Sequence, residues 1–308
     1  MIFFFYGPNT FAARRKIRDM IQAYVAKSGS DFGFEKIDGA TVSFEVLGGS
    51  LTAMPFLAAS RLIIIDSLSA NKTVAEKFPL LLEQVPETTV AVLYEPSVDQ
   101  RTSYFKTVSK ATRAVRFDTL TPPQLAAWIK REVGALGATI DQAALSALIE
   151  AVGDDQWQME QELNKLANFD PSITCEAVQK LVASSPTQSI FDLVDAMSGG
   201  QTAKALTIFR QLVAERTNEL YILTMVTWQL RNLLLAKTYG GNDQAELARR
   251  AKLSPYVAAK ALARQREFSL DKLKTSYVAA VETDYKIKSG KGNPEHLVEQ
   301  LIYNVATA

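Results

Sequence analysis

The sequence predicts an α/β domain built on a parallel sheet, followed by an all-helical region. Strand and helix patterns alternate over residues 1–120, as they do where right-handed crossovers connect parallel strands. Residues 62–65 form a continuous aliphatic run without polar alternation, which is typical of a strand covered on both faces. After residues 121–123 no further strand pattern is found, and apolar residues recur at helical spacing.

The first 120 residues are expected to contain five strands, at residues 2–6, 34–37, 62–65, 89–93 and 114–117. Helices are expected between them, at residues 10–26, 43–49, 74–84 and 100–110. Gly7, Pro8 and Asn9 predict a turn after the first strand, and Thr10 is expected to cap the helix that follows. This order of elements is the layout of a nucleotide-binding α/β domain.

The helical remainder divides at a small polar break, residues 184–186. Before this break, helices are expected near residues 125–136, 141–152, 154–168 and 174–183. After it, the patterns are helical to the end of the sequence. The predicted domains are therefore residues 1–120, 121–186 and 187–308.

The composition is that of an ordinary globular chain with room for two or three domains: 308 residues, 47% hydrophobic and 22% charged. The net charge of +1 does not indicate a strongly basic protein that binds nucleic acid by itself. One cysteine, Cys175, and one histidine, His296, exclude an internal disulfide and a Cys/His zinc site. The N-terminus lacks a basic signal region, and no apolar run reaches the roughly 18 residues of a membrane span. We expect a cytoplasmic protein without a metal or cofactor.

The loop after the first strand is where a P-loop protein binds the phosphates of its nucleotide. Such a loop needs glycines for close backbone approach, a lysine for the β- and γ-phosphates and a Ser or Thr for magnesium. Here the loop comprises Gly7, Pro8, Asn9 and Thr10, and it has neither a second glycine nor the lysine. The third strand ends in Asp66 followed by a serine, without the second carboxylate that polarises water. The sequence therefore predicts a P-loop fold that does not hydrolyse ATP.

No other catalytic group of residues replaces the missing phosphate loop. Cys175 and His296 lie in distant helical regions, so neither Cys-His nor Ser-His-Asp chemistry is supported. The chain is therefore predicted not to be an enzyme by itself. The open alternative is a divergent P-loop NTPase with unusual phosphate ligands, which saturable, magnesium-dependent nucleotide binding would support.

An apolar cluster stands immediately before the third strand, at residues 51–58. Pro55, together with the small residues that follow Leu57, disfavours another buried strand there. By residue type alone, Phe56 and Leu57 would pack beneath the sheet, because Phe and Leu are usually buried. The alternative is an exposed apolar tip kept for a partner protein.

Five stretches of the chain carry a specific resemblance. The first strand and its phosphate loop read FFFYGPNTFAARRKI, and the apolar cluster with the third strand reads MPFLAASRLIIID. The last helical region contains IFDLVDAMSGGQTAKAL, QLRNLLLAK and DYKIKSGKG. Together, in this order and over the whole chain, they resemble the delta subunit family of the bacterial DNA polymerase III clamp loader. The resemblance implies an AAA+-like N-terminal domain, a helical lid and an all-α collar domain that assembles with other loader subunits.

The resemblance also implies a function and its residues. The delta member of the loader binds the ring-shaped sliding clamp and opens it for loading onto primed DNA, without hydrolysing ATP. It holds one clamp interface open with two adjacent hydrophobic residues, which fall here on Phe56 and Leu57, with Met54, Pro55 and Ala58 beside them. Since LAASR has one extra small residue, this register holds to within one position. The resemblance thus favours the exposed tip. The implied partners are the sliding clamp (beta subunit), the gamma/tau and delta prime subunits of a hetero-pentamer, and primed DNA.

Three further expectations concern the helical region and the choice of subunit. Tyr256 lies near where the resemblance places an aromatic residue beside the end of the primed duplex, with core packing as the alternative. Trp228, Leu230, Leu233 and Leu234 form an apolar stripe that is expected to lie mostly in a core. A structural subunit resembling delta prime is the other alternative, but the Ser-Arg-Cys motif of its arginine finger is not found in this sequence.

Overall fold

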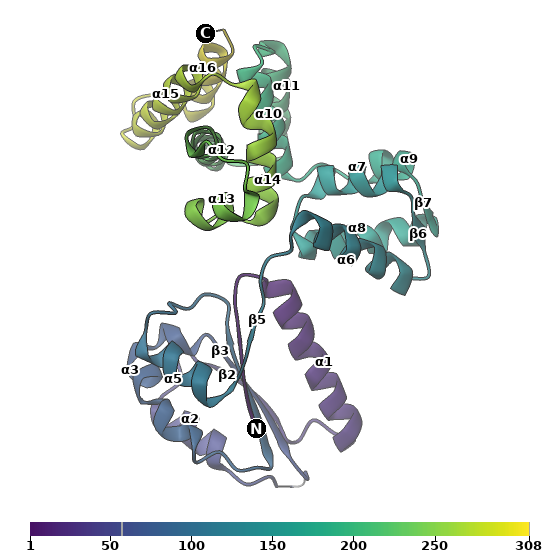
Figure 1. The fold of residues 1–308 in the computed structure, drawn as a ribbon, viewed down its shortest axis with the longest axis vertical. Helices are drawn as coiled ribbons and strands as arrows, with labels where there is room; N and C mark the ends of the chain where they lie inside the picture. Colours follow the sequence, from purple (N-terminus) through teal and green to yellow (C-terminus); the bar gives the residue numbers. More distant parts are fainter. Residues whose placement is uncertain (57, 308) are drawn as a thin grey trace. The chain divides into compact units, whose positions relative to one another are not determined.

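The computed structural model describes residues 1–56 and 58–307, which form two compact units, Met1–Thr119 and Leu120–Ala308 (Figure 1). The first unit is an α/β domain, and the second is helical apart from one short pair of strands. The predicted fold class, a parallel-sheet α/β domain followed by a helical region, is confirmed. A further boundary at residue 186, within the second unit, stays a prediction.

A five-stranded parallel sheet forms the middle of the first unit, in the strand order β2-β3-β4-β1-β5. The five predicted strands are confirmed to within two residues at each end: β1 (Ile2–Tyr6), β2 (Phe34–Asp38), β3 (Arg61–Asp66), β4 (Thr89–Glu95) and β5 (Arg113–Arg116). Because all the strands run the same way, the loops that follow them meet at one edge of the sheet, where ligands of open α/β sheets bind.

Helices cover both faces of the sheet (Figure 1). On one face α1 (Thr10–Ser28) contributes Ile17, which lies with Phe5 and Ile64. On the other face Phe4 and Ile63 lie against residues of the remaining helices. These are α2 (Phe44–Thr52), the 3-10 helix η1 (Leu68–Ala70), α3 (Lys72–Lys77), α4 (Pro79–Leu82) and α5 (Ser103–Ala111). Since successive strand residues face opposite sides, this cover on both faces explains the unbroken aliphatic run of β3.

Two local predictions in this unit are wrong in detail. Asn9, not Thr10, is the N-cap of α1, and its Oδ1 accepts a hydrogen bond from the backbone N–H of Ala12 at 2.9 Å. Thr10 is instead the first residue of the helix. The single helix expected at residues 74–84 is divided into α3 and α4, because Pro79 has no backbone N–H with which to continue α3.

The second unit begins with four helices, α6 (Pro122–Ala135), α7 (Gln142–Val152), α8 (Gln156–Phe169) and α9 (Cys175–Leu181). The side chains of Asp141, Asp155 and Thr174 accept backbone N–H groups at the starts of α7, α8 and α9. These N-caps satisfy donors that a helix leaves unpaired in its first turn. The helix starts are therefore set locally by the residues that the sequence places there.

The prediction that no strand follows residue 120 is wrong. β6 (Thr139–Ile140) and β7 (Ser172–Ile173) form a short parallel pair, in which the N–H of Thr139 also donates to Pro171 O at 2.7 Å. Strands of two residues are too short to show an alternating pattern, and each depends on a partner that is distant in the sequence. Such a pair is visible only once α6, α7 and α8 have packed.

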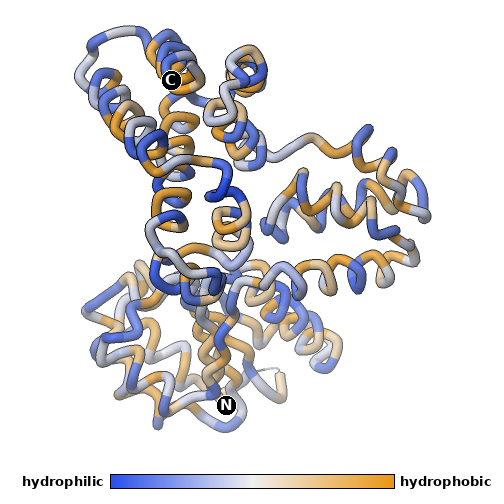
Figure 2. The backbone as a smooth tube through the Cα atoms, turned by 45° about the horizontal axis from the view of Figure 1, so that its top comes forward, coloured by the Kyte–Doolittle hydropathy of each residue, from blue (hydrophilic) through white to orange (hydrophobic). Residues whose placement is uncertain are grey.

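The remaining helices surround α12 (Glu219–Tyr239), where Leu230 and Leu233 are fully buried. Trp228 is half-buried and contacts Phe191, so the predicted stripe is mostly core. Figure 2 shows hydrophobic and hydrophilic residues alternating along these helices, as expected of amphipathic elements. They are α10 (Pro186–Ser198), α11 (Thr202–Ala214), α13 (Gln244–Ala251), α14 (Pro255–Arg264), the 3-10 helix η2 (Gln265–Glu267), α15 (Leu270–Lys288) and α16 (Pro294–Thr307). Within residues 1–56 and 58–307, no helix combines the length and apolarity that a membrane span requires.

Candidate protein-binding site

The segment between α2 and β3 exposes large apolar side chains. Met54 is 69% exposed and Phe56 is 82% exposed, whereas Leu51 before them and Ile63 after them are fully buried. Pro55 and Ala58 are half-buried. Leu57 lies outside the described residues. We call Met54, Pro55, Phe56, Leu57 and Ala58 the apolar tip; its Phe56 is no part of the hydrophobic core.

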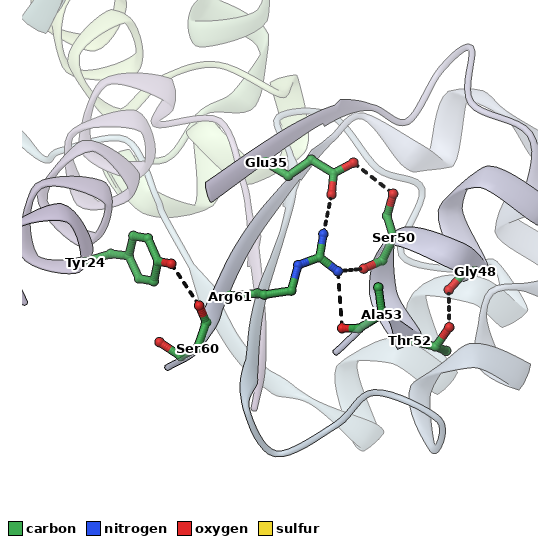
Figure 3. A network of polar contacts seen from close by, with 8 residues as sticks. All are labelled: Tyr24, Glu35, Gly48, Ser50, Thr52, Ala53, Ser60 and Arg61. Carbon is green, nitrogen blue, oxygen red and sulfur yellow. Dashed lines mark hydrogen bonds and ion pairs between the residues drawn. The ribbon is translucent and has the colours of Figure 1, made fainter. Parts of the chain in front are cut away.

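A polar network lies where the apolar tip begins, centred on Arg61, the first residue of β3 (Figure 3). The Arg61 guanidinium donates through Nη1 to the carbonyl oxygens of Ser50 and Ala53, and through Nη2 to Glu35 Oε2 at 2.7 Å. The second Glu35 oxygen accepts from Ser50 Oγ at 2.8 Å. One guanidinium therefore joins β2, the end of α2 and β3 at the point where the tip begins.

The other end of the tip is held from α1. Tyr24 Oη donates to Ser60 O at 2.8 Å (Figure 3). The N–H of Leu62 donates to Gly33 O at 2.8 Å. A Cβ atom on Gly33 would lie only 2.0 Å from Tyr24 Oη and 2.5 Å from Ser60 O. Only glycine allows this close approach, so the chain leaves the tip along a fixed path.

The degenerate phosphate loop, Gly7, Pro8, Asn9 and Thr10, directs polar groups to the chain's own backbone. The N–H of Asn9 donates to Phe117 O at 3.0 Å, and Asn9 Nδ2 donates to Asp118 O at 3.1 Å. Gly7 has a φ of 122°, and a Cβ atom there would lie 2.4 Å from Phe117 O. The loop thus anchors the segment that leaves β5, with donors that a phosphate-binding loop would keep for its ligand.

Charged residues beside this loop are also engaged with one another. Arg14 Nη2 lies 3.2 Å from Asp66 Oδ2, and the Arg14 guanidinium carbon lies 5.0 Å from the centre of the Tyr94 ring. Burial raises the pKa of the Tyr94 hydroxyl, although the charge of Arg14 opposes this. Asp66, the acid at the end of β3, is therefore paired with an arginine of the same unit.

Tyr256 lies in the second unit and is half-buried there. Its hydroxyl donates to Ile149 O at 3.4 Å, which connects α14 to α7, and burial raises its pKa to about 12. Next to it, Lys260 Nζ donates to Gln188 Oε1 at 2.5 Å and lies 4.2 Å from the centre of the Phe191 ring. These contacts favour the packing alternative for Tyr256, and a DNA contact stays a prediction.

Two features of these sites were missed from the sequence. The partners of Arg61 are backbone carbonyls and a glutamate on another strand, which no sequence spacing reveals. On α15, Val278, Val281 and Tyr285 are exposed at positions of one helix face. Their spacing of three and then four residues can be detected in the sequence. However, this spacing is typical of a buried helix face, so it would have predicted burial of these residues and not exposure.

The first unit is therefore a P-loop-type α/β domain whose phosphate loop binds its own backbone, and in which the apolar side chains of Met54 and Phe56 are exposed. The model of the DNA polymerase III, delta subunit family matches residues 3–118, and the model of the C-terminal domain of the same subunit matches residues 187–305. The chain belongs to the DNA polymerase III delta subunit family, as its sequence motifs indicated.

Two comparisons with individual proteins agree with this assignment. The curated DNA polymerase III subunit delta of Bacillus subtilis (strain 168) is 23% identical over 317 residues, covering 97% of this chain and 90% of the relative. The solved structure of the Bacillus subtilis DNA clamp loader delta protein has a TM-score of 0.72 and 22% identity, covering 100% of this chain and 95% of that chain. The second comparison shows that the fold is shared over the full length.

Proposed function

We propose that this chain is the clamp-opening subunit of the bacterial DNA polymerase III clamp loader, and that the apolar tip binds the sliding clamp. Membership of the delta family supports the loader role. The observation that carries the clamp-binding assignment is the 82% exposure of Phe56, directly beside a buried strand. A large exposed aromatic side chain on a soluble domain is a typical anchor for a protein partner.

The geometry of the apolar tip suits a binding role. Side chains on a segment that is fixed at both ends lose little conformational freedom when they dock. Burying Phe56 and Met54 in clamp pockets would contribute about 1.5–3 kcal/mol each. That free energy is large enough to compete with a marginal interface of the clamp ring.

The proposal extends to the partners and to the absence of catalysis. The chain would work in the cytoplasm within a hetero-pentamer containing gamma/tau and delta prime subunits, and would meet primed DNA through that complex. It would hydrolyse no ATP, because the loop lacks the phosphate-binding lysine and the backbone N–H of Asn9 donates to Phe117 O. A divergent NTPase remains the rival; magnesium-dependent, saturable nucleotide binding by the pure chain would favour it.

The test compares clamp affinity and stability in the same protein. Met54→Ser/Phe56→Ser should weaken binding to the sliding clamp by at least about tenfold, or about 1.4 kcal/mol. The free energy of unfolding should change by less than about 0.5 kcal/mol, because replacing exposed side chains removes no core contacts. The Phe56→Ser/Leu57→Ser protein changes the adjacent pair that the family resemblance indicates, and it should also weaken clamp binding by at least about tenfold.

A matched control is available on the far edge of the sheet. Val115 on β5 is also an exposed apolar residue, and Val115→Ser should leave clamp affinity unchanged. Clamp affinity that survives Met54→Ser/Phe56→Ser in the folded protein would rule out the assignment of the tip.

A further inference from the structure

We propose that Arg61, together with Glu35 and Ser50, positions the apolar tip for the clamp by fixing its starting point before binding. This inference rests on the proposed function and adds residues to it that do not touch the clamp themselves. We call these three residues the brace.

The brace acts at the junction of three elements. Arg61 is the first residue of β3, its side chain is only 15% exposed, and it donates to Ala53 O at 3.3 Å as well as to Ser50 O. Ala53 is the residue directly before Met54. The contact therefore fixes the backbone immediately ahead of the exposed side chains, rather than a distant part of the domain.

The brace also supplies side-chain donors at the C-terminal end of α2. α2 ends at Thr52, its C-cap residue Ala53 donates its N–H to Gly49 O, and its last turn contains no basic residue. The last carbonyl groups of a helix have no partner within it and carry partial negative charge, so they favour a nearby cation. Arg61 supplies both the donors and the charge from outside the helix. Without it, the carbonyl oxygens of Ser50 and Ala53 would lose the guanidinium that donates to both of them.

An arginine is specifically suited to this arrangement. The planar guanidinium presents several N–H groups in a fixed fork, so Nη1 can bind the carbonyls of α2 while Nη2 binds Glu35. Glu35 in turn accepts from Ser50 Oγ at 2.8 Å, which returns the network to α2. A lysine keeps the charge but offers a single nitrogen on a flexible stem, and cannot hold both sides at once.

Loss of the brace would release one end of the tip only. Ser60 would remain bound to Tyr24 at 2.8 Å, and the buried run of β3 would keep its pairing with β2 and β4. The tip would then sample more conformations in the free protein, and more of them would have to be given up on binding. The effect should appear as weaker clamp affinity and a more mobile tip, in a domain that remains folded.

The experiment uses the full chain and the purified sliding clamp. Arg61→Met should weaken clamp binding about threefold to tenfold, as expected when one or two more side chains must be ordered. Arg61→Lys should lie between this variant and the wild type. Adding Glu35→Gln to Arg61→Met should weaken binding no further, because both substitutions break the same network. Arg101→Met, which removes the surface ion pair between Arg101 and Asp99, is the matched control and should not change the affinity.

Mobility of the tip provides the readout that separates positioning from other roles. A spin label on Ala59→Cys, in a Cys175→Ser background, reports on an exposed position between the two anchors. In the absence of the clamp the label should be more mobile in Arg61→Met than in the wild type. Lower affinity with unchanged mobility would assign Arg61 a direct clamp contact and overturn the proposal, as would unchanged affinity. If Arg61→Met does not fold, Arg61→Lys and Glu35→Gln carry the same test.

The two proposals can fail separately. If Met54→Ser/Phe56→Ser weakens binding while the brace variants do not, the tip binds the clamp and the brace inference is wrong. If Met54→Ser/Phe56→Ser leaves clamp affinity intact, the proposed binding site is wrong, whatever the label shows.

Discussion

Glu95, at the end of β4, is a carboxylate with 1% of its surface exposed. Three donors surround it: the backbone N–H of Ser69 at 2.8 Å, Ser69 Oγ at 2.6 Å and Tyr104 Oη at 2.9 Å. Burial raises the pKa of Glu95 above its usual 4.5, although these hydrogen bonds oppose the shift. The structure thus contains an enclosed acid whose protonation is linked to folding.

This linkage predicts how stability depends on pH. Because the folded protein binds the Glu95 proton more tightly than the unfolded chain, the stabilisation by this group is complete below pH 4.5 and is lost as the pH rises through the folded pKa. As the pH rises above 4.5, the unfolding free energy of the wild type should therefore fall relative to that of Glu95→Gln, by at most about 1.4 kcal/mol per pH unit. Denaturant unfolding of both proteins from pH 4 to 8 measures it. A difference independent of pH would contradict the raised pKa of Glu95.

The exposure of Phe56 shows how far single residues can be predicted from sequence. Its residue type favours the core, and only the resemblance of the surrounding motif favoured exposure. What exposes it is the surroundings: Leu51 and Ile63 fill the interior on either side, and the brace fixes the chain between them. Residue type contains no information about such neighbours, so the exposed tip follows from the fold and not from its own sequence.

At the scale of elements, local chemistry was readable and pairings between distant residues were not. Ser43 and Asp155 cap α2 and α8 within one residue of the helix starts that the sequence indicated. In contrast, β6 and β7 were not predicted, because each is only two residues long and forms only by pairing with the other, which is distant in the sequence. The brace is similar, since Glu35 and Arg61 are brought together by the pairing of β2 with β3.

The contact of Tyr256 between α14 and α7 gives a prediction at this scale. A Cβ atom on Gly153, the C-cap residue of α7, would lie 3.7 Å from the Tyr256 ring, so the ring also lies close to the end of α7. Tyr256→Ala should lower the free energy of unfolding by about 2 kcal/mol, because it leaves a cavity. Tyr256→Phe should cost less than about 1 kcal/mol, since it removes one long hydrogen bond. Thermal unfolding measures both.

The same two proteins test the DNA contact. If Tyr256 stacks on primed DNA, an assembled loader carrying Tyr256→Ala should bind DNA more weakly at matched salt, while Tyr256→Phe should bind normally. Equal DNA affinity for all three proteins would remove Tyr256 from the candidate DNA contacts and leave it a packing residue.

At the scale of the whole molecule, buried clusters of the described residues lie each within one unit. The buried clusters around Ile63 and Ile64 belong to the first unit, and the cluster around Leu230 belongs to the second. Deleting one unit should therefore leave these buried clusters of the other unit intact. This separation suits a division of labour in which the first unit binds the clamp and the collar at residues 187–308 joins the loader.

The division of labour predicts the outcome of a truncation. Removing residues 187–308 should abolish assembly with the other loader subunits and leave clamp affinity within about threefold of the full chain, which is about 0.65 kcal/mol. Because this cut also exposes the face of α7 that contacts α14, a chain ending at Thr119 is the cleaner second variant. A truncated chain that still enters the loader would show that the collar does not hold this subunit in place.

Within the collar, Val278, Val281 and Tyr285 form an exposed apolar face on α15 that suits burial against a neighbouring subunit. Val281→Asp should then weaken assembly without lowering clamp affinity, as measured by size-exclusion chromatography with the purified subunits.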